Sequence, residues 1–172
     1  MNYTAPANIS GTNYDWGVNT IDGSTGWYTP TWDEMSFILT NTTTRPANRY
    51  MKAKINSVYG LIIFPDNYIH PEGAAALTNM NTQGTAWAST YDATSYWSRM
   101  ELAGAIFMPT AGYNKSYGDY GIMSVNSIGQ YWMATYSSSK ATYFQISPSA
   151  VGSSSMGPGN YIKAVRLVRD VN

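Results

Sequence analysis

The residues best suited to recognition gather near the end of the chain, at residues 129–162. A single charged side chain, Lys140, stands there among tyrosines, serines and glycines. Tyrosine offers a large amphipathic contact area at low entropic cost, while serine and glycine adapt their hydrogen bonding to a partner. The hydrophobic stretches Tyr131-Trp132 and 164–168 anchor the segment at both ends, which a flexible linker would not need. The composition therefore predicts a recognition surface.

The expected ligand-binding residues are Gln130, Tyr136, Ser137, Ser138, Ser139, Ala141, Thr142, Tyr143, Gln145, Ser147, Ser149, Ser153, Ser154, Ser155 and Tyr161, edged by Tyr117 and Tyr120. If Phe144 and Ile146 face the core, the alternation of a strand directs Tyr143 and Gln145 outward. We expect substitutions of the serines, Ala141 and Thr142 to change stability by about 0.5 kcal/mol or less, as exposed substitutions do. The competing interpretation is a solvated loop without a function.

Other site chemistry has little support in the sequence. His70 is the only histidine and no Gly-x-Ser-x-Gly phrase accompanies it, so a loop or structural role is expected. The three glutamates are scattered along the chain, which disfavours a glycosidase pair. With no cysteine, thiolate zinc sites and disulfides are excluded. The calcium phrases of lectins (Glu-Pro-Asn, Gln-Pro-Asp and Trp-Asn-Asp) are also absent. We therefore predict no enzymatic activity, no cofactor and no functional metal.

Charge and hydropathy narrow the possible partners. Ten basic residues balance ten acidic ones, which argues against a nucleic-acid-binding surface. A local basic run is predicted to be a solvated face; it consists of Arg45, Arg49, Lys52 and Lys54. The longest apolar run, at 61–64, has only the length of a strand, so we expect no membrane insertion of this segment.

Local signals predict two helices in the first part of the chain. Thr31 and Glu34 form a capping box, in which each side chain binds an unpaired amide of a helix N-terminus, and Pro46 bars continuation. A second helix is expected from about 94 to 103, ended by Gly104 as a left-handed cap. We expect four tryptophans to lie in the core: Trp16, Trp32, Trp97 and Trp132.

Strand signals dominate the rest. Two apolar runs that end in proline, at 60–66 and 105–109, predict buried strands. Glycine-punctuated stretches predict further strands at 130–135, 141–147 and 161–168. Two early helices followed by a run of strands favour an α+β fold in a single domain.

Seven short phrases occur in one order along nearly the whole chain. They are DWGVN at 15–19, TWDE at 31–34, GLIIFPDN at 60–67, WSRME at 97–101, GAIFMPTAG at 104–112, YWMAT at 131–135 and VRLV at 165–168. In order and spacing they resemble the Fibrobacter succinogenes major paralogous domain family of gut bacteria and their phages. This resemblance implies a C-type-lectin-like fold, with a small twisted antiparallel sheet, two flanking helices and a ligand surface on the final strands. Members often extend further at the N-terminus, so we expect residues 1–172 to be the C-terminal part of a longer protein.

The resemblance also implies a function. Some relatives are variable proteins of diversity-generating retroelements, in which a reverse transcriptase scatters adenine-directed changes over C-terminal codons. The corresponding variable, ligand-displaying region here is 130–163. We expect a non-enzymatic receptor- or adhesin-type domain on a bacterial cell surface or phage virion, with a protein or glycan ligand on another cell surface. The alternatives are a structural or assembly module of a bacterial surface protein and a calcium-independent glycan-binding lectin.

Several residues depart from the pattern of the family. Met133 stands where a serine is usual, and Lys163-Ala164 replaces the glycine and serine that normally precede Val-Arg-Leu. The second departure changes the geometry expected of the last hairpin. Lys140, Gln145 and Met156 cannot arise from asparagine-type template codons altered at adenine and must come from other codons.

Overall fold

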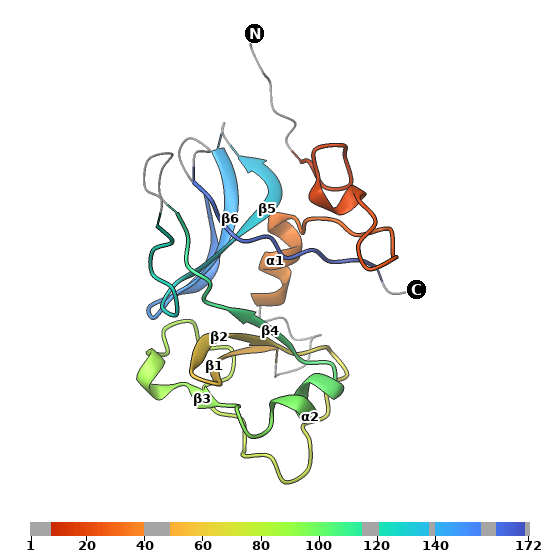
Figure 1. The fold of residues 1–172 in the computed structure, drawn as a ribbon. Coiled ribbons are helices and arrows are strands. Elements are labelled where there is room, and N and C mark those ends of the chain that lie inside the picture. Colours follow the sequence, from red (N-terminus) through yellow and green to blue (C-terminus); the bar gives the residue numbers. More distant parts are fainter. Residues whose placement is uncertain (1–7, 40–48, 115–120, 138–139, 156–160, 171–172) are drawn as a thin grey trace.

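A computed structural model describes residues 8–39, 49–114, 121–137, 140–155 and 161–170 (Figure 1). In chain order its elements are the 3-10 helix η1 (Trp16–Val18), α1 (Trp32–Leu39), β1 (Tyr50–Ile55), β2 (Val58–Ile63), the 3-10 helix η2 (Trp87–Ser89), β3 (Tyr91–Asp92), α2 (Trp97–Leu102), β4 (Ile106–Pro109), β5 (Gly129–Ser137), β6 (Lys140–Ile146) and β7 (Val151–Ser155). The mixture of helices and strands confirms the predicted α+β class.

The strands form two sheets rather than the one small sheet expected. The first has the order β3-β1-β2-β4, in which β1 and β3 are parallel and the other pairs antiparallel. The second is antiparallel throughout, with the order β5-β6-β7. Figure 1 shows α1 beside the second sheet and α2 beside the first.

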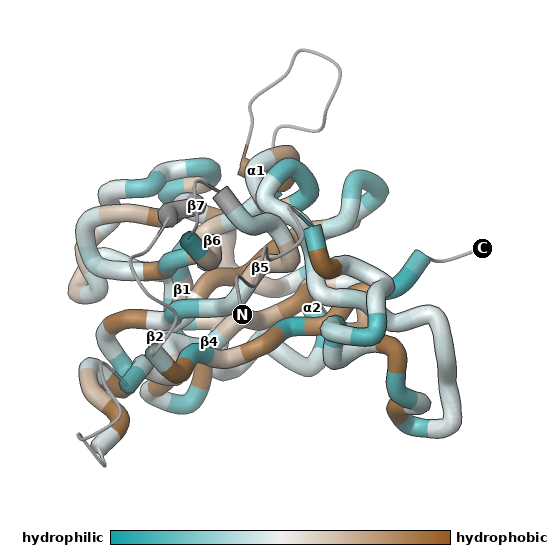
Figure 2. Tube along the Cα trace, turned by 90° about the horizontal axis from the view of Figure 1, so that it is seen from above, coloured by the Kyte–Doolittle hydropathy of each residue, from teal (hydrophilic) through white to brown (hydrophobic). Residues whose placement is uncertain are grey.

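The first sheet is buried on both faces. Tyr50, Leu61 and Met108 project into one core cluster, shared with α1 and the second sheet. Met51 and Ile62, their neighbours along the strands, project into another, shared with α2. Successive side chains of a strand point to opposite faces, so a sheet buried on both sides reads as a continuous apolar run. In Figure 2, apolar stretches accordingly run through the middle of the molecule.

The two predicted helices form, and their local signals act as expected. The Glu34 carboxylate accepts from the Thr31 amide at 2.7 Å, and the Thr31 hydroxyl accepts from the Glu34 amide at 3.3 Å. The capping box is thereby confirmed at the start of α1. The second helix, α2, is shorter than predicted, and Gly104 follows it with a φ of +91°, the left-handed conformation expected of a cap.

Some predicted elements differ from the structure. The basic run was expected to be solvated, but Arg49, just before β1, and Lys52, on β1, are buried. Lys54 is half-buried and pairs with Asp92 at 2.9 Å, and Arg45 lies outside the described residues. No strand was expected at β7. Conversely, the stretch 161–168 makes only isolated bridges, at Ile162, Ala164 and Val168, instead of a continuous strand.

A buried carboxylate organises the N-terminal segment. Asp15 is 2% exposed and accepts from the amides of Gly11 at 2.8 Å, Gly17 at 3.0 Å and Thr29 at 2.9 Å. The Thr29 hydroxyl donates to it at 2.6 Å. A side chain at Gly17 would meet the Trp27 carbonyl oxygen at 2.4 Å, so the tight crossing requires glycine. The folded segment then pairs with the C-terminal one through Tyr28 and Val168, whose backbones exchange hydrogen bonds of 2.8 and 2.9 Å.

We predict that Asp15→Asn lowers the free energy of unfolding by roughly 2–4 kcal/mol at pH 7. The NH₂ group of the new side chain would face the backbone amides that now donate to the carboxylate, so hydrogen bonds would be lost. Burial raises the pKa of Asp15, but the Thr29 hydroxyl and three backbone amides outweigh it and hold that pKa below its ordinary value. The stabilisation is therefore present at neutral pH and lost as the pH falls below about 4. Urea unfolding at pH 7 and pH 3 tests this. The exposed Asp22→Asn is the matched control, and an equal loss in both variants would contradict the prediction.

Candidate functional site

The second sheet has one face in the core and one turned away from it. Phe144 and Ile146 are fully buried in the core cluster. Tyr143 and Gln145, which alternate with them along β6, lie on the opposite face, as predicted. There Tyr143 pairs across the strands with Trp132, and Gln145 with Gln130. We call the face formed by Gln130, Trp132, Tyr143 and Gln145 the outer face.

A segment near the C-terminus covers part of the outer face. The backbone of Ala164 lies beside β5, accepting from the Trp132 amide at 2.9 Å and donating to the Gln130 carbonyl at 3.0 Å. This pairing places the adjacent Lys163 on the outer face, where its side chain is only 7% exposed. Lys163, one of the residues that differ from the pattern of the family this chain resembles, therefore lies over the outer face.

Four aromatic rings surround the Lys163 ammonium. Its Nζ lies 5.3 Å from the ring centre of Tyr113, 5.1 Å from Trp132, 4.5 Å from Tyr143 and 4.9 Å from Tyr161. All are within the range in which a ring face attracts a cation. We call these four rings the aromatic cage. They come from three separate parts of the chain, so one buried charge ties these parts together.

A chain of hydrogen bonds continues from the aromatic cage. The Lys163 ammonium donates to Gln130 Oε1. The Nε2 of Gln130 donates in turn to Gln145 Oε1 at 2.8 Å. Among the described residues, no carboxylate pairs with Lys163, and burial lowers its pKa to about 8. At pH 7 such a group remains mostly protonated, so the aromatic cage holds a cation.

Several predicted site residues are less accessible than expected. Thr142 is fully buried on the core side of β6, and its hydroxyl donates to the Thr135 carbonyl at 2.5 Å, where β5 shifts register. Ser147 is buried in a turn, bonded to Ala150. Gln130 and Tyr143 are buried beneath Lys163. The exposure on which the expected tolerance to substitution rests is therefore contradicted at Thr142 and Ser147.

The remaining predicted residues either lie nearer the surface or fall outside the residues that the structure describes. Tyr136, Ala141, Gln145 and Tyr161 are half-buried, and Ser149 is exposed. Ser138, Ser139, Tyr117 and Tyr120 lie outside the described residues, as do the side chains of Ser137, Ser153, Ser154 and Ser155. The backbone at 151–155 forms β7, which pairs with β6.

The tryptophans divide differently from the prediction. Trp32 and Trp97 are half-buried against the two core clusters. Trp16 was expected in the core but is 70% exposed on η1. Trp132 belongs to the aromatic cage rather than to the core. Sequence reasoning missed the aromatic cage, and the only signal for it was the unusual lysine at 163.

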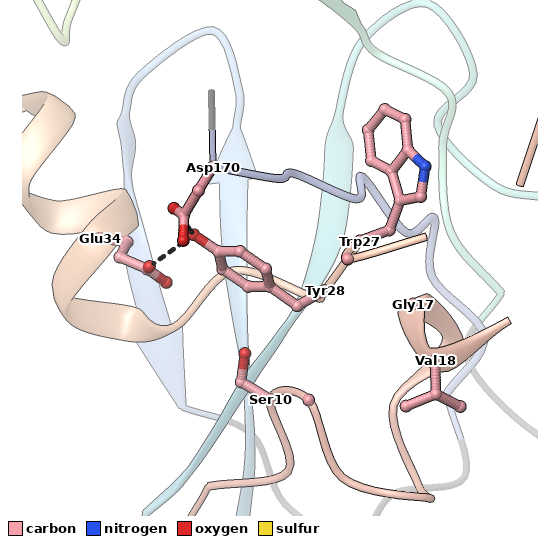
Figure 3. A pocket seen from close by; sticks show the side chains of 9 residues that line it. Ser10, Gly17, Val18, Trp27, Tyr28, Glu34 and Asp170 are labelled. Carbon is pink, nitrogen blue, oxygen red and sulfur yellow. Dashed lines mark hydrogen bonds between the residues drawn. The ribbon is translucent and has the colours of Figure 1, made fainter. Parts of the chain in front are cut away.

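A cavity of about 540 Å³, separate from the outer face, lies where the two end segments meet α1 (Figure 3). Its lining includes Tyr28, whose hydroxyl lies 3.1 Å from a Glu34 oxygen and 3.3 Å from an Asp170 oxygen. Burial first, and then the two carboxylates, raise the pKa of Tyr28 to about 12. The phenol therefore keeps its proton at neutral pH and can donate it to one carboxylate at a time.

A smaller cavity, of about 210 Å³, adjoins the aromatic cage. Tyr113 and Lys163 line it together with mainly apolar side chains, among them Ile122 and Ile162. This hollow gives the rim of the outer face an apolar recess beside the aromatic rings.

Within the described residues, no group of three or more histidine, cysteine, aspartate or glutamate side chains is placed to hold a metal ion. His70 lies in a loop, where its ring contacts the Tyr68 hydroxyl at 3.1 Å and the Ala75 carbonyl at 2.9 Å. No helix in the described ranges has the length and apolarity needed to cross a membrane.

Comparisons with protein-family models, curated proteins and solved structures find no match to this chain.

We predict that Lys163 makes stability rise with pH between about 8 and 10. Its folded pKa of about 8 lies below the ordinary 10.5, so the unfolded state binds more protons in this window. The gain should be on the order of 1 kcal/mol by pH 9.5. The contribution of Lys163 to this gain should be lost in Lys163→Met, which fills the aromatic cage without a charge. Above pH 10 the tyrosines with raised pKa values act in the opposite direction.

Denaturant unfolding at pH 7, 8, 9 and 9.5 measures this slope. Buried Lys52 has a pKa lowered to about 8 by desolvation, so part of the slope should persist in Lys163→Met. The exposed Lys140→Met is the control and should behave as the parent. If Lys163→Met retained the full slope, Lys163 would not be titrating in the aromatic cage.

Proposed function

We propose that this chain is a non-enzymatic ligand-binding domain of receptor or adhesin type, and that the outer face and its rim form the binding surface. The supporting observation is the aromatic cage, in which a buried ammonium holds four aromatic side chains in place. Side chains ordered before binding lose little entropy on binding, so preorganisation raises affinity. Aromatic residues also contribute most of the energy of protein interfaces.

The rim supplies adaptable contacts around this fixed centre. Tyr136, Ala141 and Gln145 are half-buried on β5 and β6, and Ser149 is exposed in the following turn. Their polarity and small size suit a surface that forms hydrogen bonds with a protein or glycan ligand. We place such a ligand on another cell's surface and this domain outside the cell, on a bacterial surface or phage virion.

We further propose a C-type-lectin-like fold and a place in the Fibrobacter succinogenes major paralogous domain family. The seven phrases support this proposal, together with the α+β class and final strands that turn one face away from the core. In a retroelement-diversified member, changes within 130–163 would be confined to positions that neither the core nor the aromatic cage needs. The exposed Ser149 and the half-buried Tyr136 and Ala141 meet that condition, and Gln145 meets it only in part because it accepts from Gln130.

A second candidate function, calcium-independent glycan binding, is favoured by the 540 Å³ cavity. Glu34 and Asp170 offer acceptors to sugar hydroxyls, and the exposed Trp16 lies next to the lining residue Gly17. An exposed indole is a surface on which a sugar ring can stack. The same domain could then bind a sugar without using the outer face. A structural or assembly module with no ligand remains the competing class.

We predict that Tyr136→Ala weakens binding by about 2 kcal/mol, more than tenfold in Kd, with an unchanged melting temperature. Tyr143→Ala should weaken binding and also lower the melting temperature, because Tyr143 is buried in the aromatic cage. Screening against glycans and bacterial surface proteins supplies the ligand, and calorimetry measures the Kd.

Leu102→Ala, 89% exposed on α2, is the control and should bind as the parent does. If Tyr28→Phe abolished binding and Tyr136→Ala did not, the glycan cavity would be the site. A ligand footprint on α1 and α2 alone would refute both candidates.

A further inference from the structure

We infer that Lys163 fixes an outward-facing hydrogen-bond donor on Gln145, and that this donor makes the outer face select ligands bearing a carboxylate. The inference rests on the proposed function of the outer face. It names the chemical group that the ligand must present and the residue that recognises it.

The orientation of the two amides follows from the chemistry of lysine. An ammonium has three N–H donors and no acceptor, so Gln130 can meet Lys163 only with its Oε1. Its Nε2 must then point the other way, where it donates to Gln145 Oε1 at 2.8 Å. Gln145 is left with its own Nε2 at the free end. Amide direction is often ambiguous, but here a donor-only group at one end of the chain decides it.

Burial keeps this arrangement in place. Gln130 is 6% exposed and Lys163 is 7% exposed, so water has little access to either group. Turning the Gln130 amide would set its N–H groups against the ammonium and leave the buried ammonium without its acceptor. Gln145 itself is half-buried and reaches the surface. No described residue accepts a hydrogen bond from its Nε2. The outer face therefore presents a donor whose direction is set by the Lys163 ammonium through the Gln130 amide.

The surrounding charge favours a carboxylate over a neutral acceptor. The sequence has no acidic residue from 129 to 169, and the Lys163 ammonium lies over the outer face, joined to Gln145 through the Gln130 amide. A hydrogen bond to an ionised acceptor is roughly twice as strong as one between neutral groups. A carboxylate bound at Gln145 would also be attracted electrostatically by the buried Lys163 ammonium. A neutral hydroxyl or carbonyl would be attracted less strongly.

The first experiment needs no ligand. Side-chain amide signals of Gln130 and Gln145 are followed by ¹⁵N NMR in the parent, in Lys163→Met and in the exposed control Lys140→Met. We expect Lys163→Met to shift both amide pairs and to speed the hydrogen exchange of the Gln130 amide, whereas Lys140→Met should leave both unchanged. Unchanged Gln145 signals in Lys163→Met would overturn the inference, whatever the domain binds.

The second experiment compares matched probes: glucuronate with glucose, and an N-acetyl-glutamate amide with its glutamine counterpart. The acidic member of each pair should bind at least about tenfold more tightly and shift the Gln145 amide signals. Agreement between the pairs would identify the carboxylate itself as the recognised group. Preference within one pair alone would identify a sugar acid or an acidic side chain as its source.

Gln145→Glu is the sharpest variant, because it keeps an acceptor for Gln130 and replaces the outward donor with an anionic oxygen. We expect its affinity for the acidic probes to fall by about tenfold or more. An unchanged melting temperature would show that the fold is intact. Equal binding of acidic and neutral probes at the outer face would overturn the inference but leave the proposed function standing. Shifts confined to α1 and α2 would contradict the proposed function as well.

Discussion

The burial of the first sheet on both faces is the constraint from which the rest of the structure follows. The strands β1 and β2 carry apolar side chains in both directions, so each face needs its own cover. Helix α2 supplies one cover, and the second sheet with α1 supplies the other. A sheet used as a cover has only one face in the core. The opposite face of the second sheet is not needed for the core, and the aromatic cage forms on it.

Two buried lysines show how a chain with few charges stabilises a cation in its interior. Lys52 donates to the backbone carbonyls of Thr85 at 3.0 Å and Pro148 at 3.1 Å, below the ring of Trp87. Lys163 uses an amide oxygen and four rings. Each ammonium joins segments that are distant in sequence. Neither has a carboxylate partner among the described residues, and burial lowers both pKa values to about 8.

Local signals gave the reliable part of the sequence reasoning. The capping box of Thr31 and Glu34, the left-handed Gly104 and the apolar runs ending in proline each depend on residues a few positions apart. The burial of Lys52 and the aromatic cage around Lys163 depend on segments that meet only after folding. The sequence shows that Lys52 belongs to a run of charged residues but not that other segments cover it, so the run was predicted to face solvent. On β6, alternation predicted the direction of Tyr143 correctly but not its burial, which a segment twenty residues further along provides.

The alternation along β6 also has an evolutionary consequence. Thr142, Phe144 and Ile146 are fully buried, whereas Ala141 and Gln145 are not. Random substitution across this strand would be filtered by folding at every second codon and retained at the codons between, apart from Tyr143 in the aromatic cage. Natural variants of this protein would then differ at Ala141 and Gln145 and agree at the three positions between them. Such a pattern would show, in their genes, which side chains of β6 the fold leaves free to vary.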